Sequence, residues 1–277
     1  MQRIKNSINI ISVNYNNAAK CKELLHSLKC QENRELISSI ILVDNASCES
    51  DYRELKNTIK DYEEIFIIKL VRSEINLGYS RGLNLGLSKI SVAQRNLVIM
   101  CNNDVRYNRS FVTKLCKIHY DDRSQVIFPD VVTDGVIHEN PRYINGVSKF
   151  RQLGYWVYYT HYYVAILIEV ALTNLRMLVG KKSNAFSEFR CECYLGVGAC
   201  FILTENYFQH HTRLDDRVFL WGEELLLSSQ VRNSGGCQVY EPSISVYHDS
   251  HSSVGKLPAQ HRYQLMKQSY NIYKHSF

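Results

Sequence analysis

The stretch that decides the fold runs from residue 96 to residue 106, Asn-Leu-Val-Ile-Met-Cys-Asn-Asn-Asp-Val-Arg. Its apolar part, Leu97 to Met100, is typical of a short strand buried on both faces of a sheet. The strand ends abruptly in two amides and a carboxylate, at the edge where open α/β sheets bind ligands. Hard divalent cations prefer such oxygen atoms and keep positions for substrate phosphates. An ordinary polar turn explains the same residues, since Asn and Asp favour turns.

Three strand–helix units precede this stretch. Apolar strands are predicted at 8–13, 37–43 and 65–70. Helical periodicity or charge follows each of them, at 18–28, 51–62 and 80–90. The three strands also end in Asn, Asp or Ser. This alternation predicts an α/β fold with parallel strands joined by crossover helices.

The second half of the chain is less regular. Short strands are predicted at 126–128 and 131–132 around Pro129, at 196–203 and at 244–247. Helices are predicted at 223–233, where Ser-Gly-Gly supplies a stop signal, and at 259–273. No internal repeat or low-complexity tract is evident, and 4 Pro and 13 Gly argue against long linkers.

Composition sets limits on partners and compartment. A chain of 277 residues with 45% hydrophobic and 22% charged residues can bury a large core. The net charge of +6 suits an anionic membrane surface or a phosphorylated substrate, and no nucleic-acid module accompanies it. Nine cysteines, mostly in apolar runs, and the absence of a signal peptide lead us to expect free thiols in a reducing cytoplasm. The spacing of Cys191 and Cys193 does not match a structural zinc site.

The segment 154–180 is unusually rich in Tyr, Ile, Leu and Val. It is too short in uninterrupted apolar residues to span a membrane, which takes about 20. As one helix it would carry Glu169, Thr173 and Arg176 on one stripe, with Lys181 and Lys182 following. This pattern suits a helix lying in the membrane interface, although a core helix of the domain remains the alternative.

Several polar residues are candidates for nucleotide binding. Asp44 follows a strand and could accept hydrogen bonds from a base or a ribose, or simply cap a turn. No G-x-G-x-x-G sequence follows the first strand and no Walker A sequence occurs, so a metal and local amides must hold phosphate. A cluster that could help, or could only pack a helix onto the sheet, comprises Asn76, Gly78, Arg81, Gly82 and Asn84.

Two further sites carry titratable groups. Glu223 and Glu224 begin a helix after the aromatic sequence Phe-Leu-Trp-Gly. The helix dipole alone would stabilise them, but apolar surroundings can raise the pKa of one carboxylate and make it a usable base. His248 ends a strand and could supply an imidazole to a divalent metal whose other protein ligand is Asp104.

Together these residues resemble the family 2 glycosyltransferases with the GT-A fold, most clearly the bacterial O-antigen and surface-polysaccharide branch that includes rhamnosyltransferases. The pieces occur in family order over nearly the whole chain. They are Val13 to Asn16, Val43 to Ser47, Asn76 to Asn84, Asn102 to Asp104, Gly198 to Phe201, Phe219 to Glu224 and Val246 to His248. The resemblance implies a Rossmann-like, mostly parallel central sheet flanked by helices, with a smaller mixed acceptor-side half.

The resemblance also implies site residues and domains. Asp104 and His248 would bind Mg²⁺ or Mn²⁺, and Glu224 would be the catalytic base. The expected nucleotide-sugar-binding residues are Asn14, Tyr15, Asp44, Asn76, Gly78, Arg81, Asn84, Asn102 and Asn103. We expect a nucleotide-sugar-binding half at 1–105, an acceptor-binding half at 106–255 with the possible membrane-interface helix 154–180, and a C-terminal helical tail at 256–277.

The implied function is inverting transfer of a sugar from dTDP-rhamnose or a UDP-hexose to a polyprenyl-diphosphate-linked glycan. The enzyme would be peripheral, on the cytoplasmic face of the inner membrane. The sequence departs from the family pattern at Asn102, which replaces an acid, and at Glu224, which replaces Asp. It also departs at Leu226 and Gln230, where an acid and Arg are common. The alternatives are a sugar nucleotidyltransferase and a catalytically inactive nucleotide-binding partner subunit.

Overall fold

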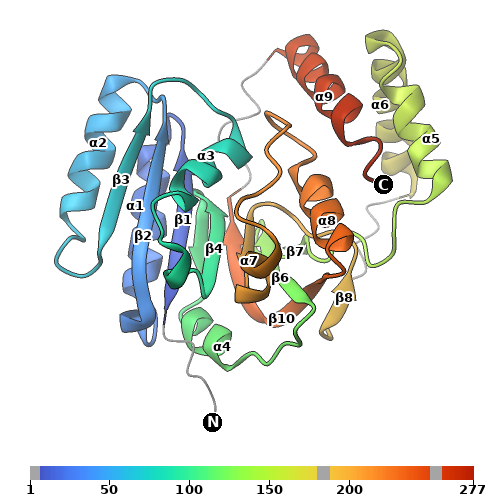
Figure 1. The fold of residues 1–277 in the computed structure, drawn as a ribbon. Coiled ribbons are helices and arrows are strands. Elements are labelled where there is room, and N and C mark those ends of the chain that lie inside the picture. The colour runs from blue at the N-terminus through green and yellow to red at the C-terminus, as the bar shows by residue number, and fades with distance from the viewer. Residues whose placement is uncertain (1–6, 180–187, 250–257) are drawn as a thin grey trace.

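A mixed sheet lies at the centre of the structure, a computed structural model that describes residues 7–179, 188–249 and 258–277 (Figure 1). Its strands are β1 Ile8–Asn14, β2 Ile37–Asn45, β3 Ile68–Ser73, β4 Leu97–Asn102, β5 Val105–Tyr107, β6 Ser124–Thr133, β7 Ile137–His138, β8 Cys191–Cys193, β9 Cys200–Leu203 and β10 Cys237–His248. The helices are α1 Ala18–Lys29, α2 Glu49–Lys60, α3 Tyr79–Leu87, α4 Phe111–Lys117, α5 Lys149–Tyr158, α6 Tyr162–Val179, α7 Glu205–His210, α8 Glu223–Asn233 and α9 Ala259–Tyr273. The main path through the sheet is β3-β2-β1-β4-β9-β6-β10-β5, with β7 beside β6 and β8 beside β10.

The first four strands of this path are parallel, and all of them except the edge strand β3 are buried on both faces. Helices α1, α2 and α4 pack against one face, and α3, α7 and α8 against the other. This double cover explains why the strands are continuous apolar runs rather than alternating ones. The predicted α/β fold, with a mostly parallel central sheet flanked by helices, is confirmed.

The registers of these parallel strands place their carboxyl ends level. Asn14 at the end of β1 lies opposite Asp44 of β2, and Val13 lies opposite Asn102 of β4. Most boundaries in this half agree with the predictions to within three residues. The third strand is the largest difference, because residues 61–66 form turns after α2 before β3 begins at Ile68.

The second half of the chain continues the same sheet. Strand β9 pairs antiparallel with β4, and β6 pairs with both β9 and β10. The prediction of two short strands around Pro129 is wrong, because β6 runs through it without interruption. The partner strand β10 has a register shift between Glu241 and Ser245 opposite Pro129, and an irregular ladder tolerates a residue without an N–H group. The division into halves at residue 105 stays a prediction.

A short antiparallel pairing brings the two halves together at one end. Strand β5, three residues long, pairs with the end of β10 so that Val105 lies opposite His248. The predicted strand 244–247 is therefore the last part of a longer strand, and the predicted strand 196–203 is ordered as a strand only from Cys200. The helices predicted at 223–233 and 259–273 are confirmed as α8 and α9.

The segment 154–180 does not form one helix. The chain turns at residues 159–161 and folds into a hairpin of α5 and α6, beside α9 (Figure 1). The buried ring of Tyr159 stacks on Tyr270 of α9 with centroids 4.5 Å apart, which holds the turn against the domain. Among the described helices, none is long and apolar enough to cross a membrane. Lys181 and Lys182 lie outside the described residues.

Candidate functional site

A cavity of about 610 Å³ opens at the carboxyl ends of the parallel strands. It lies where these ends meet the loop before α8 and the helix α9, which contributes His261 and Leu265. The predicted site residues that line it are Tyr15, Asn76, Gly78, Asn102, Asn103, Asp104, Glu224 and His248. Four others, Asn14, Asp44, Arg81 and Asn84, are not among its lining residues.

One corner of the cavity brings Asp104 and His248 together. The Nε2 atom of His248 lies 3.4 Å from Oδ1 of Asp104 and 3.4 Å from the side-chain nitrogen of Asn102. Its other ring nitrogen, Nδ1, lies 3.4 Å from Oε1 of Glu139. Burial lowers the pKa of His248, but the hydrogen bonds and charges of Asp104 and Glu139 outweigh burial and raise it to about 9.

This corner fits a divalent cation that is shared with a substrate. No group of three or more His, Cys, Asp or Glu side chains able to hold a metal occurs within residues 7–179, 188–249 and 258–277. Asp104, in the turn between β4 and β5, and His248, at the end of β10, nevertheless offer one oxygen and one nitrogen atom close together. Cations bound for phosphate chemistry need only one or two protein ligands, because the phosphates and water supply the rest.

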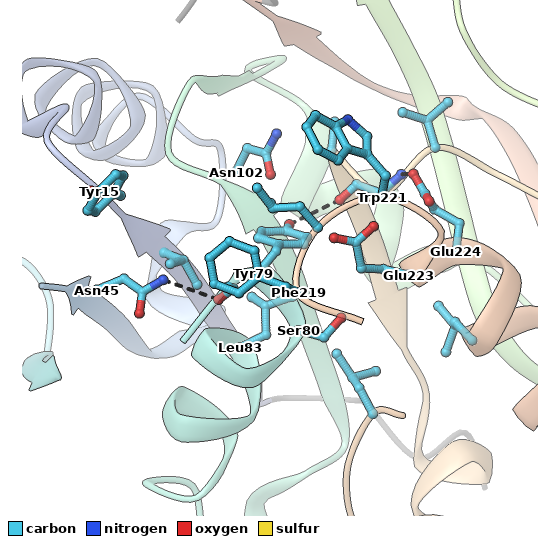
Figure 2. A pocket seen from close by; sticks show the side chains of 18 of the residues that line it. Tyr15, Asn45, Tyr79, Ser80, Leu83, Asn102, Phe219, Trp221, Glu223 and Glu224 are labelled. Carbon is cyan, nitrogen blue, oxygen red and sulfur yellow. Dashed lines mark hydrogen bonds between the residues drawn. The ribbon is translucent and has the colours of Figure 1, made fainter. Parts of the chain in front are cut away.

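The opposite wall carries a carboxylate pair at the start of α8, shown in Figure 2. The two residues before it, Trp221 and Gly222, both have positive φ angles, of 63° and 92°. A Cβ atom at residue 222 would lie 2.2 Å from the ring of Tyr273 in α9, so the turn requires glycine. This turn directs Glu223 and Glu224 toward the cavity.

The two carboxylates differ in environment. Burial, and then the charge of Glu224, raise the pKa of Glu223 to about 8. Glu224 accepts a hydrogen bond of 3.1 Å from the backbone N–H of Gly198. Burial lowers the pKa of Arg142, but the Glu224 charge contributes to a net increase. Glu223 therefore keeps its proton at neutral pH, and it is the carboxyl group whose pKa is raised by burial.

The rim contributed by the first half is held by side-chain amides. Asn45 donates to Oδ1 of Asn76 at 3.0 Å and to the carbonyl oxygen of Gly78 at 3.1 Å. Gly78 has φ of 81°, and a Cβ there would lie 2.2 Å from the carbonyl oxygen of Phe219. Of the cluster predicted to hold phosphate, Asn76 and Gly78 therefore line the cavity, and Gly78 also lets the start of α3 pack against the loop before α8.

Two predicted nucleotide contacts serve this docking. The side-chain amide of Asn84 exchanges hydrogen bonds of 2.9 Å with the backbone of Leu214 and donates to Asp216 at 3.0 Å. Arg81 donates to the carbonyl oxygen of Asp216 at 3.0 Å. These contacts fasten the loop that carries Phe219 and Trp221. Nucleotide contact by Asn84 and Arg81 stays a prediction.

Asn14 and Asp44 are buried below the rim. The Asn14 side-chain nitrogen donates to Asp51 at 2.8 Å and lies 3.3 Å from Asp44 Oδ1. Its oxygen accepts from Asn103 at 2.9 Å. Asp44 also faces Arg72, with Nε 3.5 Å from Oδ2. These contacts tie β1, β2, α2 and the turn after β4 together, and a direct role in nucleotide binding stays a prediction.

The departures at Leu226 and Gln230 have structural partners. Leu226 is fully buried and belongs to the core cluster formed with α5, α6 and α9. The Gln230 side-chain oxygen accepts from the hydroxyl of Tyr207 and from the backbone N–H of Asp215, both at 3.1 Å. Neither Leu226 nor Gln230 is among the residues that line the cavity.

Sequence reasoning missed several residues of the site. Asn45, Tyr79, Trp221 and His261 line the cavity, and the Tyr79 hydroxyl donates to the carbonyl oxygen of Gly198 at 3.0 Å. Asn45 and Tyr79 lie within the family-like stretches 43–47 and 76–84. Their position next to Asp44 and Gly78 is the sequence signal that could have identified them as site residues. Glu139 and His261 carry no local signal, because long-range contacts place them.

The sequence model of the family described as "Glycosyl transferase family 2" matches residues 9–167. Comparison with curated protein sequences gave no match.

Solved structures of similar fold include GalNAc-T7 with UDP, GalNAc and Mn²⁺ (TM-score 0.62, 16% identity, 95% of this chain and 48% of that one). They also include S. aureus TarS 1-349, with a TM-score of 0.56, 12% identity, and coverage of 96% of this chain and 71% of that one. A third is the mannosyltransferase PcManGT from Pyrobaculum calidifontis with GDP-Man and Mn²⁺, with a TM-score of 0.57, 15% identity, and coverage of 95% of this chain and 69% of that one. The chain thus spans about half the length of the GalNAc-T7 chain, and the expected GT-A fold is confirmed.

The raised pKa of Glu223 predicts a specific pH dependence of stability. The folded protein keeps this proton up to about pH 8, whereas an unfolded Glu releases it near its usual pKa of 4.5. Unfolding therefore releases a proton in this window, and the stability of the folded state decreases as pH rises from about 4.5 to 8. Glu223→Gln should remove this component from thermal unfolding curves of the ligand-free protein.

We expect the melting temperature to fall less between pH 5.5 and 8 in Glu223→Gln than in the wild type. A difference of about 1 kcal/mol corresponds to about 2 °C or more in a chain of this size. The matched control is Glu192→Gln, which changes an exposed carboxylate on β8. Equal pH profiles for the wild type and Glu223→Gln would contradict the assignment.

Proposed function

Because this chain belongs to glycosyl transferase family 2, we propose that it transfers a sugar from a nucleoside-diphosphate sugar to an acceptor hydroxyl, with inversion at the anomeric carbon. One observation carries the proposal. A single cavity collects Asp104 and His248 on one wall and Glu223 and Glu224 on the other. The cavity therefore contains both a candidate site for the donor diphosphate and a candidate catalytic base. The fold is shared with proteins solved with UDP or GDP-Man and Mn²⁺, which supports this class of donor.

Glu224 is the proposed base. Its carboxylate accepts the proton of the acceptor hydroxyl as the oxygen attacks the anomeric carbon from the face opposite the diphosphate. The bond between that carbon and the diphosphate oxygen breaks, and its electron pair leaves with the nucleoside diphosphate. The N–H of Gly198 orients the carboxylate. Glu223, protonated at neutral pH, can donate a hydrogen bond to substrate beside it.

Asp104 and His248 are the proposed ligands of a divalent cation, Mg²⁺ or Mn²⁺. Such a cation supplies charge neutralisation for the departing diphosphate. An imidazole ligand favours Mn²⁺ over Mg²⁺, which prefers oxygen ligands and holds its water tightly. Asn102 and Asn103 line the same part of the cavity and can position phosphate or sugar hydroxyl groups.

For the acceptor we propose a glycan carried on a polyprenyl diphosphate, within O-antigen or related surface-polysaccharide synthesis, with dTDP-rhamnose or a UDP-hexose as donor. The motifs shared with the rhamnosyltransferase branch support this assignment. A lipid-linked acceptor lies at the inner-membrane surface, so the enzyme needs a surface that binds lipid. The proposed place is the cytoplasmic face of that membrane.

The hairpin of α5 and α6 offers such a surface. We call its exposed apolar side chains the hairpin surface, defined by Phe150, Leu153, Trp156, Tyr163, Leu167, Val170, Leu172 and Leu175. Phe150 is 90% exposed and Leu167 is 69% exposed, which are high values for large apolar side chains. Exposed Lys149 and Arg151 lie on α5 and add attraction to anionic lipid. We therefore assign this surface to the membrane interface.

The base assignment predicts different effects for the two glutamates. Glu224→Gln should leave binding of the donor unchanged and lower transfer by about 10²–10⁴-fold, the usual contribution of a general base. Glu223→Gln keeps a neutral hydrogen-bonding side chain and should lose far less. Donor binding is measured by calorimetry and transfer by release of nucleoside diphosphate. A reversed order of effects would make Glu223 the base, and wild-type turnover in both variants would refute the mechanism.

The cation site predicts metal-dependent donor binding. In the wild type, Mn²⁺ should raise the thermal stabilisation given by UDP-, GDP- and dTDP-sugars, because a ligand that binds only the folded state raises its melting temperature. Asp104→Ala should remove the Mn²⁺-dependent part for whichever donor binds. The control is Asp122→Ala, at an exposed turn residue. Equal stabilisation with and without Mn²⁺ in the wild type would reject the site.

The membrane assignment predicts loss of lipid binding on charge insertion. Trp156→Lys combined with Leu167→Lys should reduce co-sedimentation with vesicles containing anionic lipid, because charged groups do not enter the apolar interface. The matched control is Ile67→Lys with Ile75→Lys, which changes two residues, each 66% exposed, in the first half of the chain. If both pairs partition like the wild type, or if sedimentation shows the hairpin surface buried between two copies, the assignment is wrong.

A further inference from the structure

We propose that Glu139 is a positioning residue for His248. When a cation binds beside Asp104, Glu139 holds the imidazole ring with the Nδ1 proton facing the Glu139 carboxylate and the Nε2 lone pair facing the cation. This inference rests on the proposed function, since it assigns a role within the same site. Glu139 belongs to none of the motifs that identify the family in the sequence.

The geometry separates the two ring nitrogens. Nδ1 lies 3.4 Å from Oε1 of Glu139, and Nε2 lies 3.4 Å from Oδ1 of Asp104. The ring is largely enclosed, with its side chain 12% exposed, so water does not compete freely for either nitrogen. In a neutral imidazole one nitrogen donates and the other accepts. Glu139 can only accept when ionised, so its partner Nδ1 must be the donor.

Glu139 is itself held in place by the strand beside His248. The hydroxyl of Thr133 donates to Glu139 Oε1, the same oxygen that faces the imidazole. The Glu139 backbone N–H donates to the carbonyl oxygen of Val131 at 2.9 Å. Thr133 lies opposite His248 in the pairing of β6 with β10. One strand therefore sets the positions of both the carboxylate and the ring.

The next residue fixes the loop further. The Asn140 side-chain nitrogen donates to the carbonyl oxygen of Pro129 at 2.7 Å, and its oxygen accepts from the N–H of Val197 at 2.8 Å. His138, on the other side of Glu139, contacts Asp130 at 2.9 Å and is not among the residues that line the cavity. Glu139 thus projects toward His248 from a short segment anchored at both ends.

This arrangement has a known physical consequence. A metal-bound imidazole that donates its second N–H to a carboxylate is fixed in tautomer and orientation and becomes a stronger ligand. Loss of such a partner typically costs about 10–100-fold in metal affinity. A site with only two protein ligands depends strongly on the quality of each. Glu139 would therefore set the Mn²⁺ affinity of the site without contacting the cation or the substrate.

The experiment measures Mn²⁺ binding by the electron paramagnetic resonance signal of free Mn²⁺, in separate titrations with UDP and with GDP. Glu139→Ala should weaken Mn²⁺ binding by about 10–100-fold, and Glu139→Gln should weaken it less, since its amide oxygen can still accept. The matched control is His138→Gln, which changes the neighbouring residue at the end of β7. This variant should bind Mn²⁺ as the wild type does. The Gln variant decides the matter if the Ala variant does not fold.

Two readouts separate positioning from a merely structural role. In the His248→Ala background, Glu139→Ala should have no further effect on Mn²⁺ binding, because its action passes through the ring. In ¹⁵N-labelled protein with Mg²⁺ and the same nucleotides, the His248 signal should show the Nδ1–H tautomer, and Glu139→Ala should mix the tautomers. Additive losses in the double variant, or an unchanged tautomer, would overturn the inference.

Failure of the inference can be told from failure of the proposed function. If the wild type binds no Mn²⁺ with either nucleotide, the proposed cation site and the role of Glu139 both fall. If the wild type binds Mn²⁺ and loses it in Asp104→Ala, but Glu139→Ala binds as the wild type does, only the role of Glu139 falls.

Discussion

The site depends on the antiparallel pairing of the three-residue strand β5 with the end of β10. The parallel strand β4 by itself places Asp104 in a turn at the edge of the sheet, a position where Asp is common in proteins of any function. The register that sets Val105 opposite His248 adds the imidazole, and the backbone N–H of Asp249 then donates to the carbonyl oxygen of Asp104 at 3.1 Å. Asp104 and His248, which are far apart in the chain, are thereby held together at one edge of the sheet. Sites built on strands are positioned more accurately than sites built on loops alone.

The other wall of the cavity is built by close backbone contacts. Gly78 allows the start of α3 to approach the carbonyl oxygen of Phe219, and Gly222 allows the start of α8 to approach Tyr273 of α9. Both glycines have positive φ, so each also supplies a backbone conformation that other residues adopt at a cost. Together they place Glu223 and Glu224 against the cavity that begins at the strand ends. Burial in this wall raises the pKa of Glu223, so that this carboxyl group keeps its proton at neutral pH.

Buried side-chain amides connect the two walls of the cavity. They explain why some residues of the family motifs line the cavity whereas others hold its walls in place. Asn14 accepts from Asn103 and donates to Asp51, and Asn45 holds the turn at Gly78. A buried amide that lacks partners is costly, so these residues are satisfied within the protein before any substrate binds. Motif residues can therefore serve a site by shaping its walls as well as by touching a ligand. The loop before α8 shows the same principle, because Asn84 fastens it to α3.

The sequence by itself determined the parallel half of the fold, since apolar runs of strand length, polar strand ends and helical periodicity are local signals. It also identified Asp104, His248 and Glu224, which line one cavity as expected. It failed where distant partners decide the outcome. Pro129 sits inside a strand because β10 is irregular opposite it, and segment 154–180 turns at Tyr159 because that ring stacks on Tyr270. Which glutamate keeps the proton, and that Glu139 faces His248, follow from burial and strand register. Both arise only when segments far apart in the chain pack together, so only the tertiary structure could decide them.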